Sequence, residues 1–149
     1  MMKTFFLILL ALTLSFFTSA QQIKDSEVPA NVKAVALKQA NSQPVTMWVL
    51  DKKRGKYIAS VISRTTFKGI EISLDGKWIE TTEGLQASNV PGPVIKAAVD
   101  GFPSFELSNF FYITSPDKSA YYAIDASSDE EDLRLSIDPN GNVLEKKQR

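Results

Sequence analysis

The feature that most constrains the fold is a sequence pattern that the chain contains twice. Residues 28–32 (VPANV) correspond to residues 90–94 (VPGPV), and residues 70–75 (IEISLD) correspond to residues 133–138 (LRLSID). A pattern that returns in the same order after roughly sixty residues indicates two copies of one structural unit. We therefore predict a tandem repeat.

Each copy is predicted to begin with a helix. A proline is tolerated at a helix start because the N–H it lacks would have no partner there, and it holds the preceding residue extended. Pro29 and Pro91 therefore mark the two helix starts, and Asn41 and Gly101 the two ends. Apolar residues at helical spacing predict the buried faces: Val32, Val35, Ala36 and Ala40 in the first copy, and Val94, Ala97, Ala98 and Phe102 in the second.

The rest of each copy is predicted to form four strands joined by short connections, which make neighbouring strands antiparallel. The fold class is then α+β, with two tandem repeats, each one helix followed by a four-stranded antiparallel sheet. The units are residues 21–86 and 87–149. Their strands are expected near residues 45–50, 56–63, 67–74 and 77–82, and near 105–114, 119–126, 132–138 and 142–147.

The turn sequence Asp75-Gly76 predicts the facing of side chains in the first unit. Asp-Gly favours a two-residue type I′ hairpin, which would place Trp78 opposite Ser73. Because facing alternates along a strand, Trp78 would then lie on the open face of the sheet. The core face would hold Ile70, Ile72, Leu74 and Ile79. In the second unit the equivalent register pairs Leu135 with Leu144 and Arg134 with Glu145.

The first 20 residues have the pattern of a secretory signal peptide. Lys3 supplies a positive charge, residues 5–17 are apolar, and residues 18–20 are small. The apolar run is shorter than the ~20 residues that a membrane span needs. We expect cleavage before Gln21, a periplasmic or secreted protein, and no membrane attachment after cleavage.

The composition excludes several classes of function. The chain has no histidine and no cysteine, which removes the usual general base, the serine and cysteine triads and the common zinc ligands. Its 17 basic and 17 acidic side chains give no net formal charge, so nothing indicates nucleic-acid binding. We expect no enzymatic activity, no cofactor and no metal. A hydrolase that uses only Asp and Glu is the weakest alternative.

Two acidic features have an ordinary interpretation beside a functional one. The run from Ser127 to Asp132 could bind Ca²⁺, but its acids are consecutive rather than spaced as in a calcium loop, which favours a solvated turn. Glu71 is predicted to lie opposite Glu80. Such a pair can perform acid–base chemistry when one pKa is raised, but without a predicted pocket an exposed pair, relieved by Lys68 or Lys77, is favoured.

Aromatic residues are the candidates for a binding surface. Consecutive residues of a strand face opposite sides, so about half of the strand aromatics belong to the core. The remainder would lie on the open face, where Trp and Tyr bind protein partners well. We predict partner binding by Trp78, Trp48, Tyr112 and Tyr121.

The order of these motifs resembles the PepSY-like family of secreted bacterial proteins, whose members are also described as β-lactamase-inhibitor-like. The matching segments cover most of the chain after residue 20: VPANV (28–32), TMWVL (46–50), EISLDGKWIETT (71–82), VPGPV (90–94) and LSIDPNGNVLE (135–145). The resemblance implies repeated helix-plus-strand units and a role in protein binding or inhibition. It implies no catalytic residues.

The expected function is an exported, non-catalytic module, monomeric when free, that binds a protein or peptide through the open sheet face. Such a module could modulate an envelope or extracellular hydrolase. The alternative is a periplasmic carrier of a small molecule or ion. A closed apolar cavity would favour the carrier, and a wide groove with exposed aromatic residues would favour the binding module.

Overall fold

The structure is a computed structural model that describes residues 20–149. The predicted signal peptide, apart from Ala20, lies outside this range. Neither α-helix of the described range is long and apolar enough to span a membrane. The elements follow in the order β1 (Ala20–Ile23), η1 (Asp25–Glu27), α1 (Ala30–Gln39), β2 (Met47–Asp51), β3 (Lys56–Ile62), β4 (Phe67–Ser73), β5 (Trp78–Leu85), η2 (Ala87–Asn89), α2 (Gly92–Gly101), β6 (Glu106–Thr114), β7 (Tyr121–Ser127), β8 (Asp132–Ile137) and β9 (Val143–Gln148).

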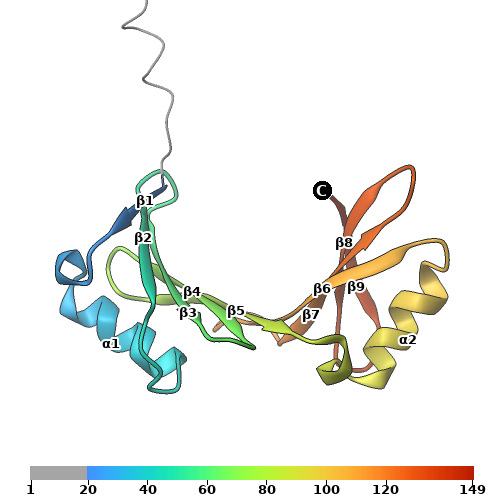
Figure 1. Cartoon of the computed structure of the whole chain (residues 1–149), viewed down its shortest axis with the longest axis horizontal. Helices are drawn as coiled ribbons and strands as arrows, with labels where there is room; N and C mark the ends of the chain where they lie inside the picture. The colour runs from blue at the N-terminus through green and yellow to red at the C-terminus, as the bar shows by residue number, and fades with distance from the viewer. Residues whose placement is uncertain (1–19) are drawn as a thin grey trace, which may run out of the picture.

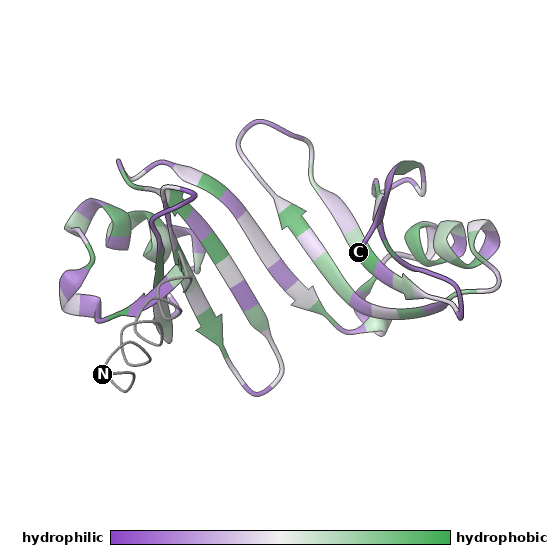
Figure 2. Ribbon diagram, turned by 90° about the horizontal axis from the view of Figure 1, so that it is seen from above, coloured by the Kyte–Doolittle hydropathy of each residue, from purple (hydrophilic) through white to green (hydrophobic). Residues whose placement is uncertain are grey.

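The strands of residues 20–149 form a single nine-stranded antiparallel sheet, in which the spatial order is the chain order. The sheet is bent into a U, with α1 and α2 on the outer side of its two ends (Figure 1). Seen from above, the central strands lie between the helices with no helix over them (Figure 2). The inner side of the U, called the concave face below, is therefore uncovered by helices.

The prediction of two separate helix-plus-four-strand repeats is wrong. Strands β5 and β6 pair from Thr81 with Thr114 to Leu85 with Phe110, so one sheet continues where two were expected to part. Strand β1, which was not predicted, extends the sheet beside β2. Both pairings satisfy backbone donors and acceptors that a separate sheet would leave free at its edge. No tight turn in the sequence predicts the pairing of β5 with β6, because α2 lies between the two strands.

Each helix packs against one end of the sheet through the face that its apolar spacing predicted. Val32 and Ala36 of α1 and Val94 and Ala98 of α2 are completely buried. Their partners in the two cores are the apolar side chains on the outer face of the strands: Trp48, Ala59, Val61, Ile70 and Ile72 beneath α1, and Ile124, Ala126, Leu133, Leu135 and Ile137 beneath α2.

Both helices begin directly after a proline, as predicted. Pro29 and Pro91 occupy the N-cap positions of α1 and α2. The residues before them, Val28 and Val90, have extended backbones and are buried at the two cores. The repeated Val-Pro dipeptide thus leads the chain into each helix, and its valine is buried in the core.

The turn between β4 and β5 differs from the predicted two-residue hairpin. Gly76 N–H donates to the Ser73 carbonyl at 3.0 Å, and Ser73 N–H donates to the Lys77 carbonyl at 2.8 Å. Gly76 has a φ of +88°, and the register shifts just before Ile72, which pairs with Trp78. A turn that is one residue longer and followed by a bulge moves the next side chain to the other face of the sheet.

This shift corrects three predictions about facing. Ile70 and Ile72 are buried as predicted, but Leu74 and Ile79, expected in the core, are 52% and 38% exposed. Trp78, expected on the open face, packs instead against the core beneath α1.

The second hairpin is shifted in a similar way. Asp138 N–H donates to the Asn142 carbonyl at 2.9 Å, and the register shifts before Ile137. Glu145 consequently pairs with Ser136 instead of the predicted Arg134, which pairs with Lys147. The expected pairing of Leu135 with Leu144 is also wrong, since Leu135 lies opposite Lys146.

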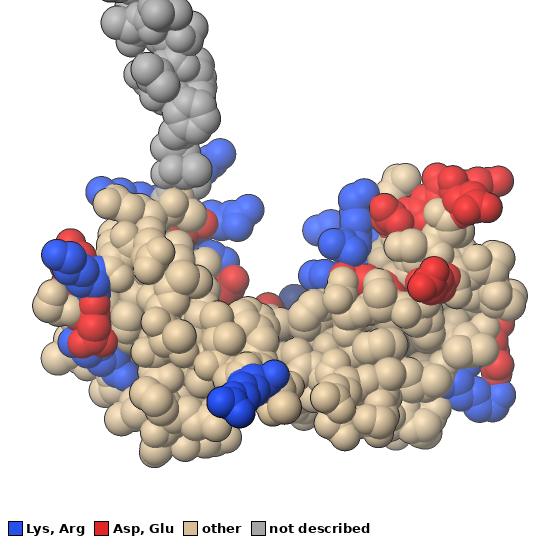
Figure 3. All heavy atoms as spheres, in the orientation of Figure 1, with Lys and Arg blue, Asp and Glu red and all other residues tan. Residues whose placement is uncertain are grey.

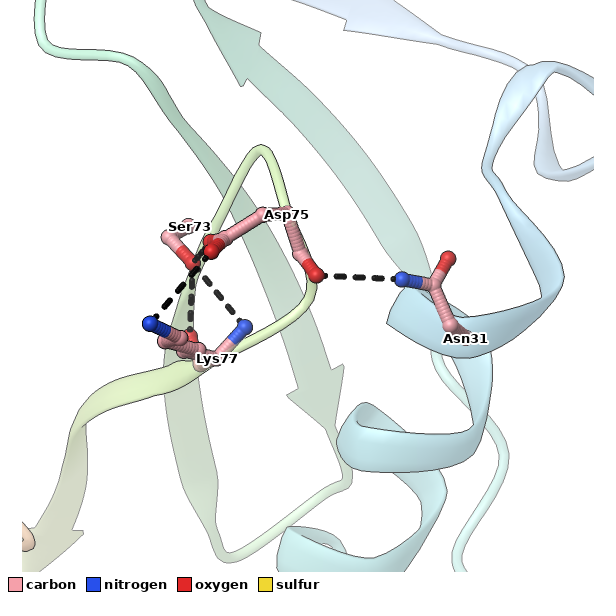
Figure 4. A network of polar contacts seen from close by, with 4 residues as sticks. All are labelled: Asn31, Ser73, Asp75 and Lys77. Atoms are coloured by element: carbon pink, nitrogen blue, oxygen red, sulfur yellow. Dashed lines mark hydrogen bonds and ion pairs between the residues drawn. The ribbon is translucent and has the colours of Figure 1, made fainter.

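Polar contacts attach the β4–β5 turn to the first turn of α1 (Figure 4). The Asn31 side-chain amide donates to the Asp75 carbonyl at 3.2 Å. Within the turn, the Ser73 hydroxyl bonds the Asp75 carboxylate and accepts from Lys77 N–H at 2.9 Å. The helix and the sheet hairpin are therefore joined at their ends as well as through the core.

Candidate functional site

The concave face contains a groove of about 450 Å³ over strands β3–β9. The space-filling view shows the hollow between the two ends of the molecule, with basic and acidic side chains on its walls (Figure 3). The outer face of each strand packs against a helix or core. Since side chains alternate between the two faces along a strand, every second residue of each strand lines the groove. The lining comprises Ile58, Phe67, Gly69, Glu71, Glu80, Thr82, Phe111, Ile113, Tyr121, Ala123, Arg134, Ser136, Glu145 and Lys147.

The floor of the groove includes apolar side chains and a glycine that makes room for an aromatic ring. A β-carbon on Gly69 would lie 3.3 Å from Cζ of Phe67, so the ring lies across this glycine. Phe67 remains 40% exposed. On the neighbouring strands, Phe111 lies opposite Gly84, and Ile113 opposite Thr82. Phe67 and Phe111 therefore offer aromatic surface at the centre of the sheet, whereas Ile113 is buried.

Two carboxylates stand together on this floor. Glu71 of β4 pairs with Glu80 of β5, as the sequence predicted. Lys56, rather than the expected Lys68 or Lys77, approaches Glu71 with 2.5 Å between Nζ and Oε2. Burial, with a smaller contribution from the charge of Glu71, raises the pKa of Glu80. The pair was expected to be exposed, but it lies half-buried in the groove.

One wall of the groove is held by a buried aspartate. The Asp125 side chain is 1% exposed and accepts two hydrogen bonds from Arg134, with Nε–Oδ1 of 2.8 Å and Nη2–Oδ2 of 3.1 Å. Arg149 reaches the same carboxylate at 2.9 Å. The Arg134 guanidinium carbon also lies 5.2 Å from the centroid of the Phe111 ring. Arg134 is thus fixed between a buried anion and an aromatic ring.

A bulge in β6 supplies a further donor to this aspartate. Asn109 has a φ of +46° and lies where the β6–β7 register shifts. Its side-chain amide donates to Asp125 Oδ2 at 3.2 Å. Burial opposes the charge of Asp125, but the bonds from Arg134 and Asn109, with the charges of Arg134 and Arg149, outweigh it and hold its pKa below the usual value. A bulge can re-aim a side chain in this way.

The predicted binding tryptophans lie away from the concave face. Trp48 is 4% exposed in the core beneath α1, and its Nε1–H donates to Asp25 at 3.1 Å. Trp78 is half-buried against the same core, and its Nε1–H donates to the Thr81 hydroxyl at 2.9 Å. Neither tryptophan can contribute to a binding surface on the concave face. The longer turn before the bulge in β5 turns Trp78 to the outer face of the sheet. Trp48 is buried by packing in the core.

The two tyrosines are separated by the sheet. Tyr112 pairs with Tyr122 on the helix-covered side, with ring centroids 5.0 Å apart. Tyr121 lies on the concave face and lines the groove. Burial, with the charges of Glu80 and Glu145, raises the pKa of its phenol. Tyr121 is therefore the one member of the predicted set that the structure places in the candidate site.

The sequence contained a usable signal for the groove residues that were missed. Phe67 and Phe111 alternate with outer-face residues along β4 and β6, so a count of every second residue places them on the inner face. The bulge at Asn109 had no comparable signal. Its position depends on pairing with β7.

The acidic run after β7 forms a tight connection rather than a cage. Ser128 N–H donates to the Glu131 carbonyl at 2.9 Å, and the Ser128 hydroxyl accepts from Glu130 and Glu131 N–H. Over residues 20–149, no group of three or more acidic, histidine or cysteine residues is placed to hold a metal ion. The hydrogen bonds of Ser128 are those of a turn over residues 127–132.

Comparisons with known proteins identify solved structures with a similar fold. No family model and no curated protein matches the sequence. Among solved structures, a DUF2874 family protein from Bacteroides ovatus is similar at a TM-score of 0.71 and 22% identity, over 80% of this chain and 86% of that one. A BLIP-like protein from Bacteroides fragilis is similar at 0.69 and 16%, over 80% and 85%. A protein described as a candidate periplasmic protein from Bacteroides eggerthii is similar at 0.69 and 17%, over 81% and 88%.

These likenesses show a BLIP-like fold. The β-lactamase-inhibitor-like part of the resemblance seen in the sequence is thereby confirmed for the fold. The PepSY-like part and the tandem repeat gain no support from the comparisons.

Proposed function

We propose that the protein is an exported, non-catalytic module that binds a protein or peptide on the concave face of its sheet. The observation that supports this most is the groove itself. It combines an apolar, aromatic floor (Phe67, Phe111 and Ile113) with fixed charged groups such as Arg134. Protein-binding sites commonly join a desolvated apolar centre to such oriented polar groups.

The shape of the groove favours a macromolecular partner over a small ligand. Small-molecule sites enclose most of their ligand's surface, whereas this groove is open between the two ends of the sheet (Figure 3). Export is supported by the pattern of residues 1–20 and by the similarity to a candidate periplasmic protein. We propose the periplasm or the exterior as the location, and a monomer as the free state.

The absence of histidine and cysteine from the sequence supports a non-catalytic role. The similarity to a BLIP-like protein supports protein binding, and a hydrolase of the envelope or exterior is the partner class we propose.

Paired arginine substitutions test the location of the binding surface. Thr82→Arg places a long side chain in the groove, and Val99→Arg places one on the exposed side of α2, where Val99 is 50% exposed. The exported protein and both variants would be used as bait for the envelope fraction, with recovered proteins identified by mass spectrometry. We expect one partner to be captured by the parent and by Val99→Arg and lost with Thr82→Arg. Equal recovery by all three baits would contradict binding on the concave face.

A further inference from the structure

Some of the charged groups in the groove are held in ion pairs, and others are not. Glu71 is paired with Lys56, and Arg134 is bound to Asp125. Glu145 and Lys147, two residues apart on β9, face the same side, but neither forms an ion pair within 4.0 Å in residues 20–149. Glu80 likewise has no ion-pair partner within 4.0 Å in the described chain, and unlike Glu145, which lies opposite Ser136, it lies opposite another acid, Glu71.

Glu80 stands where an uncompensated charge is unfavourable. It is half-buried, and its cross-strand neighbour Glu71 is also acidic. A carboxylate that is partly removed from water requires a compensating partner, and like charges directly opposite one another destabilise a sheet. The charges of Lys118 and Lys56 lower the pKa of Glu80, but Lys56 is bound to Glu71 and neither amine forms an ion pair with Glu80 within 4.0 Å. The free protein therefore holds a negative charge in the groove with no cation in direct contact with it.

The surroundings of Glu80 suit one kind of side chain. Ile113 and Tyr121 pair across β6 and β7 and line the groove beside it. Ile113 is buried, so the half-buried rings of Tyr121 and Phe111 provide the accessible apolar surface around this carboxylate. Lysine and arginine have an aliphatic stem that packs on apolar surface and a cationic head that seeks a carboxylate.

We propose, building on the proposed function, that the groove receives a lysine or arginine side chain from a projecting loop of the partner. Its cationic group binds the carboxylate of Glu80, and its aliphatic stem packs against the half-buried ring of Tyr121. The complex then contains the ion pair that the free protein lacks, in a groove from which the partner excludes water. Partners without a basic residue at the loop tip would leave Glu80 buried and unpaired, so Glu80 acts as a specificity residue.

A library of displayed, disulfide-closed peptides with random loops provides the probe. It would be selected on the exported protein, and the enriched peptides would be synthesised for affinity measurement. We expect lysine or arginine at the loop tip beside apolar residues. Affinity should fall at least tenfold with Glu80→Gln and stay unchanged with Glu130→Gln, an equivalent change in the exposed β7–β8 connection. Glu80→Lys should bind a peptide whose basic tip residue is replaced by glutamate.

The outcomes separate this inference from the proposed function. Peptides that are lost with Thr82→Arg but lack a basic tip residue, or that ignore Glu80→Gln, would overturn the role of Glu80 and leave concave-face binding intact. Peptides that bind Thr82→Arg as well as the parent would overturn both. A selection that enriches no peptide would also count against both.

Discussion

Gly76 lies so close to Asn31 that a β-carbon at Gly76 would stand 2.4 Å from Nδ2 of Asn31. The same relationship recurs at the other end of the sheet, where a β-carbon at Gly141 would stand 2.7 Å from the carbonyl oxygen of Pro93. Both glycines have left-handed backbones, with φ of +88° and +93°. In each case a glycine turn lets a β-hairpin contact the first turn of a helix.

Substituting these glycines should destabilise the protein unequally. A left-handed φ costs a non-glycine residue about 1–2 kcal/mol, so Gly76→Ala and Gly141→Ala should each lose at least that much. Gly141→Ala should lose more, because it meets the backbone of Pro93, whereas Gly76→Ala meets a side chain that can move. Urea unfolding measures both differences.

Two further variants serve as controls for this comparison. Gly92→Ala adds a β-carbon in α2 with nothing within 4 Å, so it should be neutral or stabilising by up to about 1 kcal/mol. Combined with Gly76→Ala, Asn31→Ala should remove the destabilisation that comes from the close contact. The destabilisation that comes from the left-handed φ at position 76 should remain. If Gly76→Ala proves as stable as the parent, the close approach is not a constraint on the fold.

The two tryptophans should differ in their contribution to stability, and neither should matter directly for binding. Trp48→Ala removes a buried ring from the core beneath α1 and should cost about 3–5 kcal/mol. Trp78→Ala removes a half-buried ring and its bond to Thr81, and should cost about 1–3 kcal/mol. Equilibrium denaturation gives both values. A neutral Trp78→Ala would contradict the packing of Trp78 against the core beneath α1 and would leave this ring free for contact with a partner.

Asp125 should stabilise the protein at neutral pH and lose this effect in acid. Its folded pKa is depressed, so its stabilisation is complete above the unfolded value of about 3.9 and disappears as pH falls through the folded value. Asp125→Asn should therefore be destabilised by about 1–3 kcal/mol at pH 7, since Arg134 loses its buried partner. Denaturation across pH 2–7 should show the two proteins converging at the acid end. A gap that persists at pH 2 would argue against the ionised carboxylate as the source.

Glu80 should show the opposite dependence. Its folded pKa is raised, so its ionisation destabilises the native state as pH rises from the unfolded value, about 4.3, through the folded value. Glu80→Gln should be more stable than the parent at pH 7 and equal to it below about pH 4. Thermal unfolding at several pH values tests this, with Glu130→Gln as the exposed control. A loss of stability in Glu80→Gln at pH 7 would show that Glu80 makes a favourable native contact.

The processed protein should begin at or next to Gln21. The cleavage pattern ends at Ala20, and Gln21 then starts the edge strand β1, where it pairs with Leu50. Mass spectrometry of the exported protein identifies the new N-terminus. Recovery of the intact chain from the membrane fraction would contradict both export and cleavage.

What the sequence determined by itself is the set of local features. The helical spacing of Val32 and Ala36 marked a buried face, and the proline at position 29 marked a helix start, because both depend only on neighbouring residues. The cross-strand pair of Glu71 with Glu80 was also predicted correctly, because the bulge at Ile79 compensates for the extra residue of the turn, but its position in a groove was not predicted.

Only the tertiary structure decided the pairing of β5 with β6 and the facing of Trp78. The first depends on backbone hydrogen bonds between strands that a helix separates in the sequence, so no local pattern specifies it. The facing of Trp78 depends on a single extra residue in a turn. Because successive side chains of a strand point to opposite faces, a shift of one residue moves a side chain from the solvent face to the core face. The concave face, and with it the groove around Glu80, exists because one continuous sheet bends with both helices on its outer side.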